Sequence, residues 1–335
     1  MKLSARAERL QPSATLTITA KAKALKSQGV DVIGFGAGEP DFDSPDHVKE
    51  AAINAINQGL TKYTGVGGID ELKDAIIHRL KEDHNLEYEK SEIITSVGAK
   101  HTLYNVIQVL FDKGDEVIVP APYWVSYPEQ MKLAEATPVI LETKESDGFK
   151  ITPEALKQHI NSNTKALILN YPSNPTGATY NEAELRAIVD VAMDAGLIII
   201  SDEIYEKIIY GGIKHIPVAS LGEDIKKATI LVNGVSKTYS MTGWRIGYAA
   251  GDKDVISAMS KLQGQSTSNP TSISQWAAIA AFTGDHQVIE DRTKEFEQRK
   301  NYIVEKLNDI PQISCFDPQG AFYVFPNVSG CYGKE

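Results

Sequence analysis

The stretch Asn233-Gly-Val-Ser-Lys237-Thr-Tyr-Ser-Met-Thr-Gly-Trp-Arg245-Ile-Gly-Tyr248 is the part of the chain from which the other segments are best understood. It lies between two short apolar runs, 228–232 and 246–250, which are typical of buried strands. A lysine between buried strands is partly shielded from water, so its amine loses its proton more easily and can act as a nucleophile or Schiff-base partner. Arg245 follows eight residues later and offers a two-point grip for an anion. The stretch therefore predicts a site for a phosphorylated aldehyde.

The composition narrows the class of protein. The chain has 335 residues, 42% of them hydrophobic and 23% charged, which is ordinary for a globular protein of more than one domain. Its net charge is −10 and no basic cluster is visible, which argues against nucleic acid as a partner. No apolar leader or long apolar run suggests a membrane partner, so we expect a cytoplasmic enzyme. Cys315 and Cys331 fit neither a zinc pattern nor a disulfide framework, and we expect no metal.

From Glu92 onward, apolar strand-like runs alternate with helical patterns. Strands are predicted at 93–97, 117–119, 139–141, 166–169 and 197–200, with helices that include 153–160 and 181–195. This alternation predicts a three-layer α/β/α domain with a mostly parallel sheet, in which ligands bind at the carboxyl ends of the strands. Five residues directly follow predicted strands and are expected in one crevice: Gly98, Trp124, Asn174, Asp202 and Lys237.

The two ends of the chain look different from this α/β part. Residues 32–35 are predicted as a short strand before a glycine-rich turn, which lacks the third glycine of a dinucleotide fingerprint. A charged amphipathic helix is predicted at 285–308 and a strand at 320–325. We therefore predict an N-terminal arm with part of a small α+β domain at 1–45, a large cofactor-binding domain at 46–284, and the start of the C-terminal small domain at 285–335.

Four motifs in this order carry a family resemblance. They are Pro122-Tyr-Trp-Val-Ser-Tyr127, Asn170-Tyr-Pro-Ser-Asn-Pro-Thr-Gly177, Ser201-Asp-Glu-Ile-Tyr205 and Ser236-Lys-Thr-Tyr-Ser-Met-Thr-Gly-Trp-Arg245. Together they resemble the pyridoxal-phosphate aminotransferases of fold type I, class I/II, in particular the bacterial aspartate aminotransferases of the Bacillus and Thermus kind. The resemblance runs from about Pro12 to Phe325 and implies pyridoxal 5′-phosphate as the cofactor.

The resemblance also implies roles for the reacting centre. Lys237 would be the Schiff-base lysine and proton shuttle, and Asp202 would face the pyridine nitrogen of the cofactor. Asn174 and Tyr205 would bond the O3′ oxygen, and Trp124 would stack on the ring. Four of these assignments have a plain structural alternative: Lys237 as a surface lysine, Asp202 as a helix N-cap, the Asn174 motif as a turn and Trp124 as core packing.

The phosphate contacts follow from the same resemblance. Arg245 would supply the charge, and Gly98 with Ala99 would offer backbone N–H groups at a helix start. Many family members carry a serine three residues before the lysine, but this chain has Gly234 there. Ser236 is the candidate replacement.

Substrate contacts are implied more weakly. Gly38 would touch the α-carboxylate, with Trp124 and Asn174 nearby. Lys100 stands where this subgroup has a lysine for the distal carboxylate, with Ser13 or Thr15 as helpers; a solvated helix-start lysine is the alternative. The partner-subunit arginine of other members is replaced by Gly264.

Tyr63 resembles a tyrosine that reaches the phosphate of the neighbouring subunit, which implies a homodimer with shared sites. The expected activity is a ping-pong transfer of the amino group of L-aspartate or glutamate to 2-oxoglutarate or oxaloacetate. Alternatives are an aromatic amino acid or prephenate aminotransferase, or a pyridoxal-phosphate lyase on the same fold. Family members continue beyond the position of Glu335 and carry a carboxylate-binding arginine there, so a catalytically incomplete cofactor-binding fragment is a further alternative.

Overall fold

A seven-stranded sheet with the order β1-β7-β6-β5-β4-β2-β3 forms the centre of the computed structural model, which describes residues 2–36 and 38–333. β2 to β6 run parallel, whereas β7 is antiparallel to both β6 and β1. The mostly parallel sheet predicted from the sequence is therefore confirmed. The strands are β1 Ile93–Ser96, β2 Glu116–Ala121, β3 Thr137–Glu142, β4 Thr164–Asn170, β5 Ile198–Asp202, β6 Thr229–Gly234 and β7 Gly247–Ala250.

The central strands are buried on both faces, as parallel strands covered by helices must be. Alternate residues of each strand face opposite layers: Ile230 and Val232 of β6 pack on one side and Leu231 on the other. The apolar runs around the quoted stretch thus form β6 and β7, paired in register from Leu231 with Ala250 to Gly234 with Gly247.

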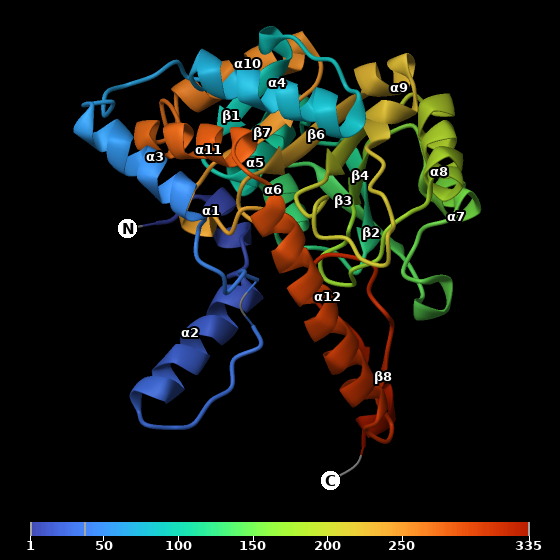
Figure 1. Ribbon diagram of the computed structural model, residues 1–335. Helices are drawn as coiled ribbons and strands as arrows, with labels where there is room; N and C mark the ends of the chain where they lie inside the picture. The colour runs from blue at the N-terminus through green and yellow to red at the C-terminus, as the bar shows by residue number, and fades with distance from the viewer. Residues whose placement is uncertain (1, 37, 334–335) are drawn as a thin grey trace.

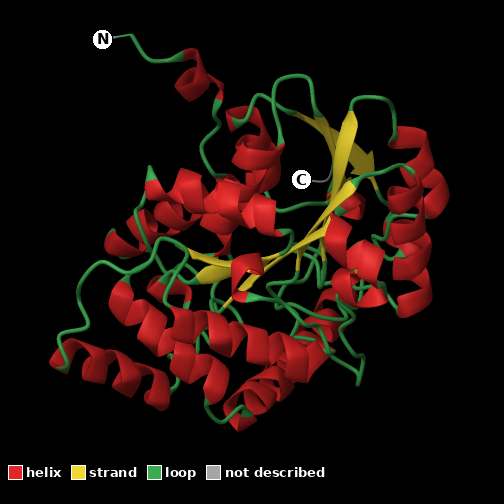
Figure 2. Cartoon of the chain, turned by 90° about the horizontal axis from the view of Figure 1, so that it is seen from above, coloured by secondary structure: helices red, strands yellow, loops and turns green. Residues whose placement is uncertain are grey.

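Helices cover both faces of the sheet, which completes the predicted three layers (Figures 1 and 2). One face packs against α5, α6 and α10, and the other against α7, α8 and α9 on one half and α3, α4 and α11 on the other. These helices are α3 Asp46–Asn57, α4 Asp70–His84, α5 Ala99–Leu110, α6 Ser126–Leu133, α7 Pro153–His159, α8 Glu182–Asp194, α9 Glu223–Ala228, α10 Lys253–Gly264 and α11 Ser272–Thr283.

The terminal segments contain α1 Ala5–Arg9 and α2 Ala14–Ser27 at the start of the chain and α12 Gln287–Asn308 near its end. α2 and α12 extend away from the layered part, whereas α1 contacts α6 (Figure 1). α2 buries none of its residues, and Ile289 is the buried residue of α12. None of the helices in the described part of the chain is long and apolar enough to cross a membrane. The three domain boundaries stay predictions.

Two predicted strands are wrong. Residues 32–36 lie outside the strands, and Ile33 and Phe35 remain 77% and 83% exposed, so this apolar run lacks the neighbouring strand that a ladder needs. Residues 320–325 make a single bridge, from Gly320 to Ile209, because Ala321 adopts a left-handed φ of 56° that breaks the extended course. The short pair β8 Ser314–Cys315 and β9 Pro326–Asn327 forms on either side of that break.

α12 holds the segment before α3 through the side chain of Phe42. The guanidinium carbons of Arg292 and Arg299 lie 5.2 and 5.1 Å from the centre of the Phe42 ring. Arg299 also pairs with Asp41 at 2.8 Å. Cation–π contacts of this geometry are attractive, so residues 41–42 are attached to α12 although they are far from it in sequence.

Candidate active site

A cavity of about 680 Å³ lies at the carboxyl ends of the parallel strands, at the position expected for a ligand in such a sheet. Most of the residues predicted for the site line it. From the predicted set the cavity contains Ser13, Thr15, Gly38, Ala99, Lys100, Trp124, Asn174, Asp202, Tyr205, Ser236, Lys237 and Arg245. The sequence-based expectation of one crevice therefore agrees with the geometry, while the role of each residue stays a prediction.

Lys237 lies three residues after the end of β6 and lines the cavity. Its Nζ donates a hydrogen bond to the carbonyl oxygen of Gly38 at 2.5 Å. Burial lowers the pKa of the Lys237 amine to about 8, and the nearby charge of Arg245 acts in the same direction. A larger fraction of this amine is therefore unprotonated than of an ordinary lysine amine, as a nucleophile or proton acceptor requires.

Asp202 is the last residue of β5 and is almost fully buried. Its Oδ2 accepts a hydrogen bond from the Tyr127 hydroxyl at 2.6 Å, and its Oδ1 accepts one from the backbone N–H of Ile204 at 3.3 Å. Burial raises the pKa of this carboxyl to about 6, against the lowering effect of the Tyr127 bond. The helix-cap alternative is wrong, because residues 204–207 form a turn and no helix begins within 203–217.

Asn174 and Tyr205 approach the cavity from the loops after β4 and β5. The Asn174 motif does form a turn, in which the Asn174 N–H donates to Oδ1 of Asn170 at 2.8 Å, yet Asn174 still lines the cavity. The Tyr205 hydroxyl lies 2.6 Å from that of Tyr323. Both readings of the Asn174 motif, turn and binding residue, are therefore compatible with its position.

The predicted phosphate end is built where α5 begins. Gly98 has a φ of 81°, and an added Cβ would overlap the guanidinium group of Arg245, so the glycine permits that close approach. Arg245 Nη1 donates to the carbonyl of Thr242 at 2.7 Å and Nη2 to that of Val97 at 3.4 Å. The guanidinium group thus lies beside the free N–H groups at the start of a twelve-residue helix.

The unusual glycine at 234 has a packing reason. A Cβ there would come within 2.8 Å of the carbonyl oxygen of Ile246 and 2.9 Å of the Cα of Gly247. β6 and β7 approach too closely at this pair for a serine to fit without a backbone shift. Ser236, the candidate replacement, is buried and lines the cavity.

Lys100 and Trp124 form the wall near the start of α6. Lys100 Nζ lies 4.9 Å from the centre of the Trp124 ring. Burial and then the charge of Arg245 lower the pKa of Lys100. A half-buried ammonium group held over an aromatic ring differs from the solvated helix-start lysine considered above. Tyr63, by contrast, is 89% exposed and is not among the residues that line this cavity.

Sequence reasoning missed several residues of the site, of which four bear on the buried groups. Tyr127 and Tyr323 contact Asp202 and Tyr205 as described, and Glu39 and Thr242 line the cavity beside Lys237. Tyr127 could have been found, since it follows Trp124 by three residues at the start of a helix. Tyr323 could not, because the run around it was interpreted as a strand.

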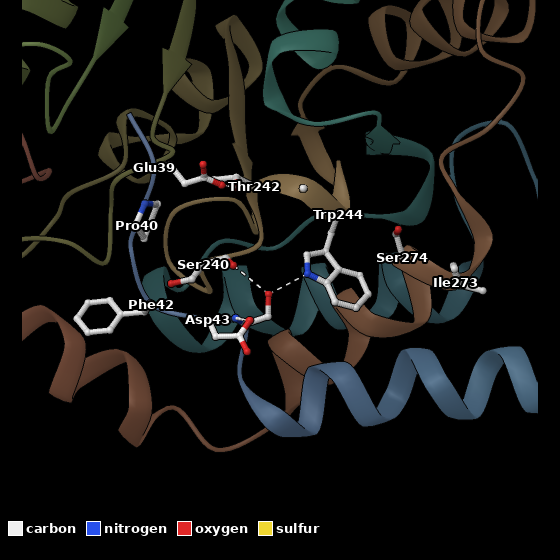
Figure 3. A pocket seen from close by; sticks show the side chains of 11 residues that line it. Glu39, Pro40, Phe42, Asp43, Ser240, Thr242, Trp244, Ile273 and Ser274 are labelled. Atoms are coloured by element: carbon white, nitrogen blue, oxygen red, sulfur yellow. Dashed lines mark hydrogen bonds between the residues drawn. The ribbon is translucent and has the colours of Figure 1, made fainter. Parts of the chain in front are cut away.

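A second hollow of about 370 Å³ adjoins the cavity, and Glu39 and Thr242 line both. Figure 3 shows it between the segment 39–44 and the loop after Lys237. Here the Ser44 hydroxyl donates to the carbonyl of Ser240 at 3.0 Å and accepts from Trp244 Nε1 at 2.8 Å. These bonds attach the segment that carries Gly38 to the loop that carries Lys237.

A largely buried cluster that begins at Glu203, the residue after Asp202, has the composition of a metal site. Oxygen or nitrogen atoms of Glu203, Glu206 and His215 lie within 4.8 Å of one another. His215 already pairs with Glu203 at 2.8 Å, and His84 pairs with Glu206 at 2.6 Å. These pairs explain how the two buried carboxylates are accommodated by protein groups alone.

Comparison with known proteins places this geometry in a family. Residues 30–331 match the family described as aminotransferase class I and II. The aspartate aminotransferases of Geobacillus stearothermophilus and Bacillus subtilis are 58% and 55% identical over 98% of this chain and 84% of their own length. The structure of the Thermus thermophilus aspartate aminotransferase with maleate superposes with a TM-score of 0.94 at 41% identity, covering 98% of this chain and 86% of that one. This chain belongs to the class I and II aminotransferases.

Proposed function

We propose that this protein is an aspartate aminotransferase that uses pyridoxal 5′-phosphate and moves the amino group of L-aspartate or L-glutamate to a 2-oxo acid by a ping-pong mechanism. One observation carries the proposal: a single cavity brings together a buried lysine of lowered pKa, a buried carboxylate and an arginine at a helix start. The names of the Geobacillus and Bacillus relatives support the aspartate assignment.

The chain's own residues fit the proposed cofactor. The cavity is large enough for a drug-sized ligand, and the absence of a Cβ at Gly98 lets the Arg245 guanidinium group lie against the start of α5, an arrangement that suits a phosphate. Lys237 and Asp202 line the same cavity, so the amine and the carboxylate can face a ligand whose phosphate is bound by Arg245. When bound, the cofactor would supply an aldehyde carbon for the lysine and a pyridine ring that withdraws electrons from the substrate.

Lys237 would act first as a nucleophile and then as a general base and acid. With a pKa of about 8, roughly one amine in ten is unprotonated at pH 7, compared with far fewer for an ordinary lysine. Its Nζ would take the proton from the substrate Cα and return one at the other end of the reacting system. The bond to the Gly38 carbonyl oxygen shows that Nζ can already be held at one point of the cavity.

The other residues hold charge and orientation. Asp202 would place a fixed negative charge beside the pyridine nitrogen, while Asn174 and Tyr205 would donate hydrogen bonds to the ring oxygen. Trp124 would provide the stacking face, supported edge-on by Tyr127 at 5.4 Å and 84°. Arg245 and the N–H groups at the start of α5 would bind the phosphate.

A dicarboxylic substrate is favoured by the positive charge of Lys100 at the far wall. Ser13 and Thr15 line the cavity as well, so hydroxyl groups are available beside that charge. The comparison structure from Thermus thermophilus is described with maleate, which is itself a dicarboxylate. Lys100 would select the distal carboxylate by charge-assisted hydrogen bonding.

We also propose a homodimer in which Tyr63 reaches the phosphate of the partner's site. Its high exposure and its position outside this chain's own cavity are what such a role requires. Hybrid dimers test this. Tyr63→Phe and Lys237→Ala are each expected to be nearly inactive, and exchange of subunits between them should restore part of the activity. Exchanged hybrids without any recovery would contradict shared sites.

A substrate screen tests the proposed function. The purified protein is mixed with pyridoxal 5′-phosphate and single amino acids, and the loss of the bound aldehyde's absorbance is followed. We expect kcat/KM for aspartate and glutamate to exceed that for phenylalanine. Relatives from Aquifex aeolicus and other bacteria, 45–47% identical, are named as probable aspartate/prephenate aminotransferases, so prephenate is included as an acceptor. Release of ammonia or loss of a side-chain group without formation of the bound amine would instead indicate a lyase.

A further inference from the structure

We propose that Tyr127 is a positioning residue: its hydroxyl, fixed in the first turn of α6, holds the Asp202 carboxylate ionised and turned toward the cavity. The inference deepens the proposed function and depends on it for the role of Asp202. It concerns a tyrosine whose side chain is 1% exposed and that also lines the cavity.

The geometry of the Tyr127 bond identifies a strong interaction. The distance of 2.6 Å between the hydroxyl oxygen and Oδ2 is that of a hydrogen bond to an ionised oxygen. Tyr127 can only donate to a carboxylate, so the bond favours the charged form of Asp202. Oδ1 accepts the Ile204 N–H, which fixes the plane of the carboxylate from a second direction.

Three contacts fix the position of Tyr127 or of the helix that carries it. Its ring meets the Trp124 ring edge-on, and its backbone N–H donates to the Trp124 carbonyl at 3.1 Å. α6 is attached to α5 by a bond of 2.9 Å from Gln130 to the carbonyl oxygen of Lys100. A donor that cannot move away supplies its stabilisation without reorganisation, which is the condition for effective electrostatic support.

The other groups that act on Asp202 do not replace this donor. Glu203, next along the chain, raises the Asp202 pKa, and Lys237 from the loop after β6 lowers it. Burial, and to a smaller extent the charge of Asp202, raises the pKa values of Tyr205 and Tyr323, so both remain neutral hydroxyls. Among the residues that the structure describes, Tyr127 is the side chain that donates a hydrogen bond to the carboxylate.

Tyr127→Phe tests the inference in the protein without cofactor. Aspartate labelled with ¹³C at Cγ is incorporated, and the Asp202 resonance is identified by its absence in Asp202→Asn. We expect the carboxyl pKa of the variant to rise above the wild-type value of about 6, because a bond that stabilises the charged form is lost. In the protein loaded with pyridoxal 5′-phosphate we expect kcat at pH 7 to fall by about tenfold, with the acid limb of the pH–rate profile moved to higher pH.

Tyr180→Phe is the matched control. It removes another buried tyrosine hydroxyl, one that accepts the Ile151 N–H at 3.2 Å and is not among the groups that act on Asp202. It should leave the Asp202 titration unchanged. An Asp202 pKa in folded Tyr127→Phe equal to that of wild type would overturn the inference.

A second measurement tests the inference if the Tyr127→Phe protein does not fold. 3-Fluorotyrosine placed at position 127 is more acidic and donates a stronger hydrogen bond, so the Asp202 pKa should fall; no change would again overturn the inference. The titration needs no cofactor, so it separates this inference from the proposed function. A wild-type protein that transaminates nothing would refute the function while the ¹³C shift could still establish the Tyr127 bond.

Discussion

The two walls of the cavity are built in opposite ways. One wall consists of strand ends and the first turns of α5 and α6, where Asp202 and Ser236 are buried and Lys237 is nearly so. The other wall comes from α2 and from residues 35–36 and 38–39; α2 buries no residue and Phe35 is 83% exposed. Buried groups have shifted pKa values and fixed partners, whereas exposed groups keep solvent as an alternative partner. Substitutions of the buried groups Asp202 and Lys237 should therefore impair chemistry, whereas those at the half-buried Lys100 and in the arm wall should adjust substrate affinity.

The largest effect is expected at Lys237. Lys237→Ala removes the amine of lowered pKa and should abolish covalent attachment of pyridoxal 5′-phosphate, measured by borohydride reduction and mass spectrometry. Lys73→Ala is the control, since Lys73 also has a pKa lowered by burial but bonds to the carbonyl of Lys90 elsewhere. If borohydride still fixes the cofactor to Lys237→Ala, Lys237 is not the lysine that attaches it, and the strand-end wall loses its proposed nucleophile.

Asp202→Asn should follow, because it keeps the shape and removes the charge. We expect a folded protein that still attaches the cofactor and loses at least about two orders of magnitude in kcat, roughly 3 kcal/mol of barrier. Circular dichroism and stopped-flow absorbance with aspartate measure the two halves of this expectation. Near-normal turnover would show that buried charge in this wall has no chemical role.

Lys100→Met should act on substrate selection. The side chain keeps its length and loses its charge, so KM for aspartate should rise by about 30-fold while that for alanine changes little. Lys150→Met is the control, because Lys150 also lies over an aromatic ring, 5.9 Å from the centre of Tyr180. Equal effects on aspartate and alanine would show that Lys100 does not contact the distal carboxylate.

The rate of cofactor attachment should increase about tenfold between pH 7 and pH 9. The neutral amine is the nucleophile, and the Lys237 pKa of about 8 means that its neutral fraction rises from roughly a tenth at pH 7 to near completion at pH 9. The rate of attachment to cofactor-free protein should rise over that interval and then level off. A rate that continues to rise toward pH 10 would show an amine with the pKa of an exposed lysine.

The smallest effect is expected in the arm wall. Thr15→Val removes a hydroxyl that lines the cavity and should raise KM for aspartate by no more than about threefold, with kcat unchanged. Thr17→Val, on the same helix but not lining the cavity, should leave both constants unchanged. A Thr15→Val effect as large as that of Lys100→Met would contradict the division between the walls.

The same division explains what sequence could predict. Residues at or shortly after the ends of β4, β5 and β6 were found because each polar group comes close behind a buried apolar run, as at Asp202 and Lys237. The arm gives no such signal, so 32–35 was predicted as a strand although it lies exposed. Tyr323 was missed for a related reason: its position depends on the left-handed Ala321, and most non-glycine residues give no warning of that conformation.

The attachment of Phe42 to α12 means that the segment 38–44 is held at three points. One end meets Lys237 through the Gly38 carbonyl, the other is tied to the loop after β6 through Ser44, and the middle is clamped by Arg292 and Arg299. α12 is about 33 Å long, so a small tilt moves its far end much further than its near end. Because the segment 38–44 is bonded at Gly38 and at Ser44, it cannot follow such a tilt freely. We therefore expect a displacement of α12 to reach the Gly38 carbonyl oxygen that accepts the Lys237 hydrogen bond.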